Sequence, residues 1–77
     1  MKLVFVTRRG CHLCDDALRV VRELGAEPEI ADVDADEELH RLYDWRVPVV
    51  LGDGVVIAEG RIDREQLRLR LSPPHER

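Results

Sequence analysis

The sequence lacks both a long apolar run and an excess of basic residues. Its longest apolar segments, "LVFV" and "VPVVL", are the size of strands, whereas a membrane-spanning helix needs about 18 apolar residues. The formal net charge is −4, and a nucleic-acid-binding domain usually carries a basic stripe. We therefore expect neither a membrane nor a nucleic acid as a partner.

The N-terminus also lacks the features of a targeting segment. The apolar part of "MKLVFVTRRG" is too short for a signal peptide, so we expect a cytoplasmic protein. The chain has 77 residues, which suits one small domain with one compact core. We place this domain at residues 1–72, with residues 73–77 as a tail that begins with two prolines, and we expect a monomer.

Cysteine is scarce, and the two that occur lie three residues apart in "TRRGCHLCDDAL", as Cys11 and Cys14. A permanent disulfide is uncommon in a reducing cytosol. Paired cysteines there indicate redox chemistry or metal binding. The position of the pair in the fold is needed to separate these two.

The apolar pattern predicts seven elements in the order βαβ, α, ββ, α. The first strand is apolar and β-branched, and the next segment has apolar residues at helical spacing up to Gly25, a typical helix stop. Pro28 suits an edge strand, and a glycine-rich turn between two β-branched runs predicts a hairpin. The expected elements are a strand over 2–6, a helix over 12–24, a strand within 27–34, a helix within 34–45, a hairpin over 47–59 and a helix over 64–71.

This order predicts an α/β fold with a four-stranded mixed sheet flanked by helices. The βαβ crossover makes the first two strands parallel, and the hairpin adds two antiparallel strands. Asp34 or Asp36 is expected to cap the second helix, whose buried side would hold Leu39, Leu42 and Tyr43, and Asp63 the third. Trp45 is expected to pack near the end of the second helix or to border the active site.

Cys11 follows the first strand and a short loop, at the start of a helix. The unpaired N–H groups and the dipole of that end favour a thiolate over a thiol. Arg8, Arg9 and a protonated His12 would add to this effect, whereas Asp15 and Asp16 would oppose it. Cys14 is one turn further along, within bonding reach, so that it can displace a mixed disulfide formed at Cys11.

Other uses of the cysteine pair have less support. A structural zinc site usually has four ligands, and His40 and His75 do not have suitable spacing to complete one. An iron–sulfur cluster shared between two chains, or an unreactive structural pair, also fits the bare count. A CxxC motif near a βαβ unit indicates a redox dithiol first.

At this point the chain resembles the thioredoxin superfamily, and specifically short bacterial glutaredoxin-like proteins. The segments that carry the resemblance are "LVFVTRRGCHLCDDA", "ADVDAD", "YDWRVPVV" and "EGRID". It implies a thioredoxin-like fold, with Cys11 as the nucleophile, Cys14 as the resolving thiol and Val47–Pro48 as a cis peptide facing the dithiol. The residues before the last helix, Gly60 and Arg61, would bind a glutathione carboxylate.

The chain departs from ordinary glutaredoxins at two places. His12-Leu13 replaces the usual Pro-Tyr between the cysteines, and Glu59-Gly60-Arg61 replaces the usual pair of glycines. Glu59 could repel a glutathione carboxylate, whereas Arg61 could attract one. The substrate-binding candidates are therefore Val47, Pro48, Arg9, His12, Gly60 and Arg61.

The sequence thus predicts a thiol–disulfide oxidoreductase that acts on a disulfide-containing protein or a glutathione mixed disulfide. No cofactor or metal is expected to be bound, and glutathione or a reductase would supply the electrons. The alternatives are a non-catalytic module that binds a peptide or glutathione, and a carrier of a metal or an iron–sulfur cluster.

Overall fold

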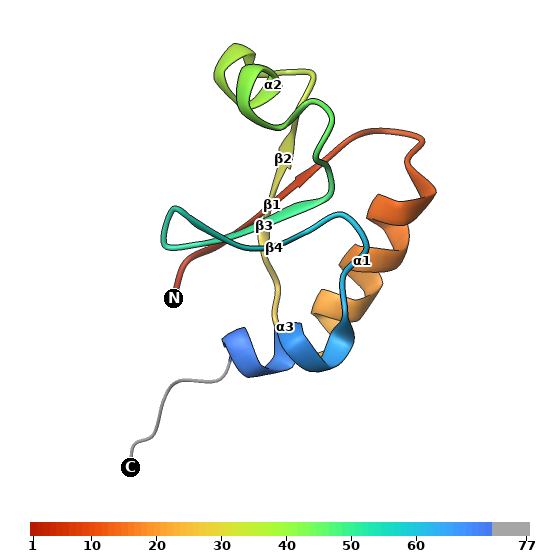
Figure 1. The fold of residues 1–77 in the computed structure, drawn as a ribbon, viewed down its shortest axis with the longest axis vertical. Coiled ribbons are helices and arrows are strands. Elements are labelled where there is room, and N and C mark those ends of the chain that lie inside the picture. The colour runs from red at the N-terminus through yellow and green to blue at the C-terminus, as the bar shows by residue number, and fades with distance from the viewer. Residues whose placement is uncertain (72–77) are drawn as a thin grey trace.

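The computed structural model describes residues 1–71, which fold into seven elements (Figure 1). In chain order these are β1 (Leu3–Thr7), α1 (His12–Glu23), β2 (Glu29–Asp32), α2 (Glu37–Tyr43), β3 (Val49–Gly52), β4 (Val55–Glu59) and α3 (Arg64–Leu71). The predicted order of strands and helices is confirmed. The predicted boundary at residue 72 and the tail over 73–77 lie outside the described residues.

The four strands form one mixed sheet in the order β2-β1-β3-β4. β1 pairs with β2 in parallel and with β3 antiparallel, and β3 pairs antiparallel with β4. β2 is therefore an edge strand, as Pro28 predicted. The predicted α/β class is confirmed, and the arrangement matches a thioredoxin-like fold.

The two faces of the sheet are covered by different helices. Successive side chains of a strand point to opposite faces, so Phe5 and Val50 pack on one side, with residues of α1 and α3. Val6 and Val49 pack on the other side, where α2 supplies Leu39 and Tyr43 from its partly buried positions. In Figure 1, α1 and α3 lie together and α2 lies apart from them.

The β3–β4 turn follows from its sequence. Asp53 and Gly54 both have positive φ angles, 52° and 84°, as the two central residues of a type I′ turn require. Asp and Gly tolerate this left-handed conformation better than most residues. The hairpin predicted from "GDG" is therefore formed by local turn chemistry.

Side-chain caps fix the start of two helices. The Asp36 carboxylate accepts a hydrogen bond from the Leu39 N–H at 3.0 Å, so α2 starts after Asp36, the second of the two predicted caps. The Asp63 carboxylate accepts one from the Gln66 N–H at 3.0 Å, as predicted for α3. Such caps satisfy backbone N–H groups that have no partner within the helix.

Helical spacing overestimated the burial of one side chain of α2. Leu42 was expected to be buried with Leu39 and Tyr43, but it is 39% exposed. α2 is only seven residues long and meets the sheet through Leu39 and Tyr43 alone, so its contact is too narrow to cover Leu42.

Among residues 1–71 no helix is long and apolar enough to cross a membrane.

Candidate functional site

The two cysteines occupy the junction between β1 and α1. Cys11 is the N-cap of α1 with an extended backbone, and its Sγ accepts a hydrogen bond from the Cys14 N–H at 3.1 Å. The two residues form a disulfide, with their Cα atoms 5.1 Å apart. Sulfur at this position lies against the unpaired N–H groups of the helix, where a negative charge is stabilised.

The two sulfurs differ in access to solvent. Cys14 is 1% exposed and belongs to the core cluster with Phe5 and Ala17, whereas Cys11 is half-buried at the edge of that cluster. An incoming group can therefore reach Cys11 and not Cys14. This asymmetry is the one needed for an attacking and a resolving thiol.

A short loop places Cys11 at the helix start. The Cys11 N–H donates to the Arg8 carbonyl at 3.3 Å, which closes a turn over residues 8–11. Gly10 inside this turn has a φ angle of 79°, a left-handed conformation that favours glycine. Gly10 thus allows the left-handed backbone conformation of the turn that leads into Cys11.

The loop before β3 lies at the same end of the sheet as the loop that carries Cys11. The Val47–Pro48 peptide bond is cis, and the Pro48 carbonyl accepts a hydrogen bond from the Gly60 N–H at 2.8 Å. Pro48 is buried, while Val47 and Cys11 both pack at the border of the core cluster that contains Cys14. Because Val49 pairs with Val6 at the end of β1, the structure places Val47–Pro48, and Gly60 hydrogen-bonded to it, at the end of the sheet where the loop to Cys11 begins.

The other predicted binding residues are exposed. Arg61 lines a small cavity together with Leu13, the residue before Cys14, and with Ile62. Arg9 and His12 are also exposed, and within residues 1–71 their side chains make no hydrogen bond or ion pair with the rest of the protein. The same holds for Arg61, so Arg9 and Arg61 are cationic groups available to a ligand.

Arg8 does not act as a free cation beside Cys11. Its guanidinium donates to the Asp34 carboxylate at 2.8 and 2.9 Å, to the Asp44 carbonyl at 3.1 Å and to the Asp44 carboxylate. These hydrogen bonds hold the pKa of Asp34 below its ordinary value and raise the pKa of Arg8. Two carboxylates compensate the Arg8 charge. The stabilisation of a Cys11 thiolate that we expected from Arg8 must therefore come from Arg9 and from the N-terminal end of α1.

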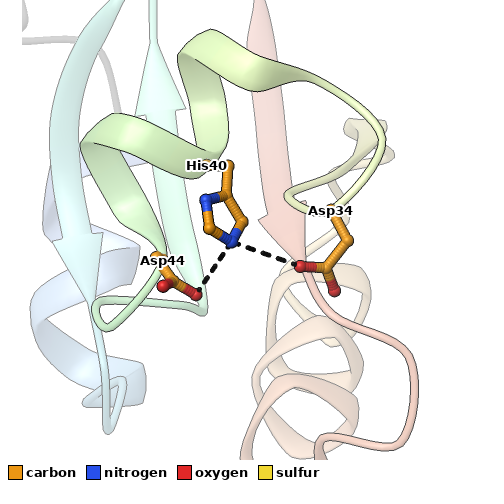
Figure 2. A group of neighbouring side chains, drawn as sticks. All are labelled: Asp34, His40 and Asp44. Atoms are coloured by element: carbon orange, nitrogen blue, oxygen red, sulfur yellow. Dashed lines mark ion pairs between the residues drawn. The ribbon is translucent and has the colours of Figure 1, made fainter.

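The same two carboxylates flank His40. Figure 2 shows the His40 ring between Asp34 and Asp44, with Nε2 at 3.8 Å from the former carboxylate and 3.5 Å from the latter. These three side chains could together offer ligands to a metal ion. Arg8 already places a positive charge on both carboxylates, however, and this charge opposes a second cation. The cluster is best described as an ion-pair network around Arg8.

We expect Arg8→Met to destabilise the protein at pH 7 more than at pH 3. The pKa of Asp34 is lowered in the folded state, so its contribution is present above the unfolded pKa, about 3.9, and is lost as the pH falls through the folded value. The measurement is the urea midpoint of wild type and variant at both pH values.

The matched control is Arg41→Met, because Arg41 pairs with Glu38 on its own helix. Exposed pairs of this kind contribute little, so its midpoint should stay close to wild type at both pH values. If the Arg8 variant lost the same stability at pH 3 as at pH 7, the pairing with Asp34 would not explain the loss.

A second ion pair borders Gly60. Arg46 donates to both Glu59 carboxylate oxygens, at 2.7 and 2.9 Å, and lies 5.2 Å from the centre of the Tyr43 ring. These hydrogen bonds hold the pKa of Glu59 below its ordinary value. The charge of Glu59 is therefore compensated by Arg46. Glu59 should repel a ligand carboxylate less than its position in the sequence suggested.

Sequence reasoning missed both networks. Arg8 lies 26 residues from Asp34 and 36 from Asp44, and Arg46 lies 13 residues from Glu59. The sequence spacing of two charged residues predicts an ion pair only when both lie in one helix or opposite each other in one hairpin. No local pattern could have indicated the partners of Arg8. Arg46 and Glu59 flank the predicted hairpin, but they are not opposite each other, since Glu59 pairs with Val49.

Comparisons with known proteins agree with this geometry. An X-ray structure of target protein XcR50 from X. campestris is 31% identical, with 92% of this chain and 99% of that chain covered and a TM-score of 0.75. A solution NMR structure of protein Ne2328 from Nitrosomonas europaea is 34% identical, with 92% and 91% covered and a TM-score of 0.78. No curated protein matches.

The family assignment rests on a match over nearly the whole chain. The model of the glutaredoxin-like domain (DUF836) matches residues 2–72, a range that includes both cysteines, Val47–Pro48 and Gly60. The resemblance seen in the sequence is therefore confirmed at the level of the family. This chain belongs to the glutaredoxin-like domain (DUF836) family.

Proposed function

We propose that this protein is a thiol–disulfide oxidoreductase that works through Cys11 and Cys14. The observation that carries the proposal is the asymmetric pair at the start of α1. A partly accessible sulfur lies at the helix end, and a buried sulfur lies within disulfide distance of it. A purely structural cross-link would not need one sulfur at the surface in a position that stabilises a thiolate.

The reaction of the reduced pair follows from this arrangement. The Cys11 thiolate attacks a substrate disulfide; the substrate S–S bond breaks, a Cys11–substrate mixed disulfide forms and one substrate thiolate leaves. Cys14, deprotonated, then attacks the Cys11 sulfur, which forms the Cys11–Cys14 disulfide and releases the second substrate thiol. Two electrons pass from the dithiol to the substrate, and glutathione or a thiol reductase returns them.

The neighbouring loops supply a surface for the substrate. Among residues 1–71, neither the N–H nor the C=O of Val47 forms a backbone hydrogen bond in a turn, loop or cap, so both are available to an extended segment that adds alongside, as a strand adds to a sheet edge. Arg61 and Arg9 offer positive charge to a carboxylate. The substrate is a disulfide-containing protein or a glutathione mixed disulfide, and the reaction takes place in the cytoplasm.

A redox titration tests the proposal. The protein is equilibrated in buffers of reduced and oxidised glutathione, quenched with an alkylating agent and weighed by mass spectrometry. We expect the dithiol to close in one two-electron transition, at a potential between about −270 and −120 mV, the range of related dithiols. A transient glutathione adduct should form at Cys11 and not at Cys14.

The alternatives are separated by further measurements. A binding module would retain its peptide or glutathione after both cysteines are replaced. A metal carrier would be isolated anaerobically with stoichiometric metal or a coloured cluster. If the two thiols alkylated independently in every buffer, the oxidoreductase proposal would be wrong.

A further inference from the structure

Trp45 is the most exposed large apolar side chain among the described residues. It is 92% exposed, whereas a tryptophan in a small domain is usually well buried. The expectation that it packs at the end of α2 is therefore wrong. An exposed indole fits its other expected position, at the border of the active site.

The residues on both sides of Trp45 are held firmly. Asp44 accepts hydrogen bonds from Arg8 through its carbonyl and its carboxylate. The Arg46 N–H donates to the Tyr43 carbonyl at 2.9 Å, and the Arg46 side chain is bound to Glu59. The backbone that carries the indole is thus anchored to the β1–α1 loop, α2 and β4, and the exposed ring points away from these contacts.

This position adjoins the predicted substrate edge. Trp45 precedes Val47 by two residues, so their Cα atoms lie at most about 7 Å apart. Leu42, one helical turn before Trp45, is 39% exposed, and residues three apart in such a turn share one side. The charged groups next to Leu42 and Trp45 in sequence, Arg41, Asp44 and Arg46, are all in ion pairs, so the charges that flank these two apolar side chains are compensated.

We propose that Leu42 and Trp45 form a contact surface for the polypeptide part of a protein disulfide, on the side of Val47 away from Pro48. The inference rests on the proposed function and names its substrate class. A polypeptide that pairs with Val47 has residues beyond the reacting cysteine that lie over Trp45. An apolar side chain there would be covered by the indole ring, and exposed aromatic anchors of this kind carry much of the affinity of protein contacts.

Activity on matched substrates tests the proposal. The substrates are hydroxyethyl disulfide and two synthetic ten-residue peptide disulfides, one with leucines and one with lysines around the cysteine. For Trp45→Ala, we expect the ratio of kcat/KM for the leucine peptide to that for hydroxyethyl disulfide to fall about 10-fold. Trp45→Phe should restore most of this ratio, because a phenyl ring still covers an apolar side chain.

A control separates this effect from general loss of apolar surface. Leu69 is 60% exposed on α3, outside the proposed surface, so Leu69→Ala should leave the ratio within about twofold of wild type. The lysine peptide should respond less to Trp45→Ala than the leucine peptide. Equal losses for both peptides and for hydroxyethyl disulfide would overturn the inference, since they would indicate damage to the dithiol site alone.

A second readout uses the single tryptophan of the chain. In Cys14→Ser, Cys11 can be trapped as a mixed disulfide with either the leucine peptide or glutathione. We expect a blue shift of Trp45 fluorescence with the peptide and little change with glutathione. Identical spectra for the two adducts would contradict a polypeptide contact.

The two proposals fail in distinguishable ways. If wild-type protein reduced none of the three disulfides, the oxidoreductase function itself would be wrong. If wild type reduced all three and Trp45→Ala left their ratios unchanged, only the polypeptide surface would be wrong.

Discussion

Cys11→Ser should abolish disulfide exchange on every substrate. The hydroxyl of serine is protonated at neutral pH and is a far weaker nucleophile than a thiolate. We expect kcat/KM for hydroxyethyl disulfide to fall by at least about 100-fold, to the rate of the uncatalysed exchange. The measurement is the initial rate with glutathione as the reductant, together with a thermal melt to show that the variant is folded.

Cys14→Ser should separate the two kinds of substrate. A glutathione mixed disulfide can be resolved by a second glutathione, so this activity needs Cys11 alone. A protein disulfide needs an internal thiol to release the product, so this activity should fall close to background, with the substrate left attached to Cys11. Mass spectrometry of the stalled reaction should show one adduct per chain.

Comparison of the two variants shows which cysteine attacks the substrate and which one resolves the mixed disulfide. If Cys11→Ser retained exchange activity and Cys14→Ser lost it, the assignment of attacking and resolving thiols would be reversed. That outcome would conflict with the burial of Cys14, which is 1% exposed. If neither variant changed activity, the chemistry would not involve this pair.

Phe5→Ala should have the largest effect on stability. Phe5 is fully buried in the cluster that α1 and α3 share with β1 and β3, and Cys14 belongs to the same cluster. Removal of such a ring costs about 3–5 kcal/mol, against a total free energy of unfolding of about 4–12 kcal/mol for a domain of this length. The melting temperature should fall by at least about 12 °C.

The matched control is Leu69→Ala, which removes a large apolar side chain from an exposed position on α3. Alanine is a strong helix former, so the free energy of unfolding should change by less than about 0.5 kcal/mol. Urea denaturation followed by circular dichroism measures both variants. A Phe5→Ala effect as small as that of Leu69→Ala would mean that the core is not organised around this residue.

Local chemistry explains why much of the fold could be predicted. The hairpin follows from Asp53-Gly54, the end of α1 from Gly25 and the starts of α2 and α3 from Asp36 and Asp63. Each of these signals acts between residues that are close in the chain. The CxxC pair at a helix start belongs to the same class, since strand, loop and helix are consecutive.

The apolar pattern was a weaker guide to burial. Leu13 is an apolar residue of the first turn of α1 but is 37% exposed, and Ile30 of β2 is 47% exposed. Leu13 is in the first turn of α1, beside the small cavity that Arg61 also lines, and Ile30 lies on an edge strand. A periodic pattern identifies the face of an element, but only its neighbours in space decide how far that face is covered.

The sequence by itself determined the order of the elements, the caps and turns at their ends, and the CxxC motif with its family. Only the tertiary structure decided that Arg8 is bound to Asp34 and Asp44, that Arg46 is bound to Glu59, and that Trp45 is left in solvent between them. The reason is physical. Turns, caps and helix ends depend on backbone contacts within a few residues, whereas charge pairing and exposure depend on which distant segments the sheet brings together.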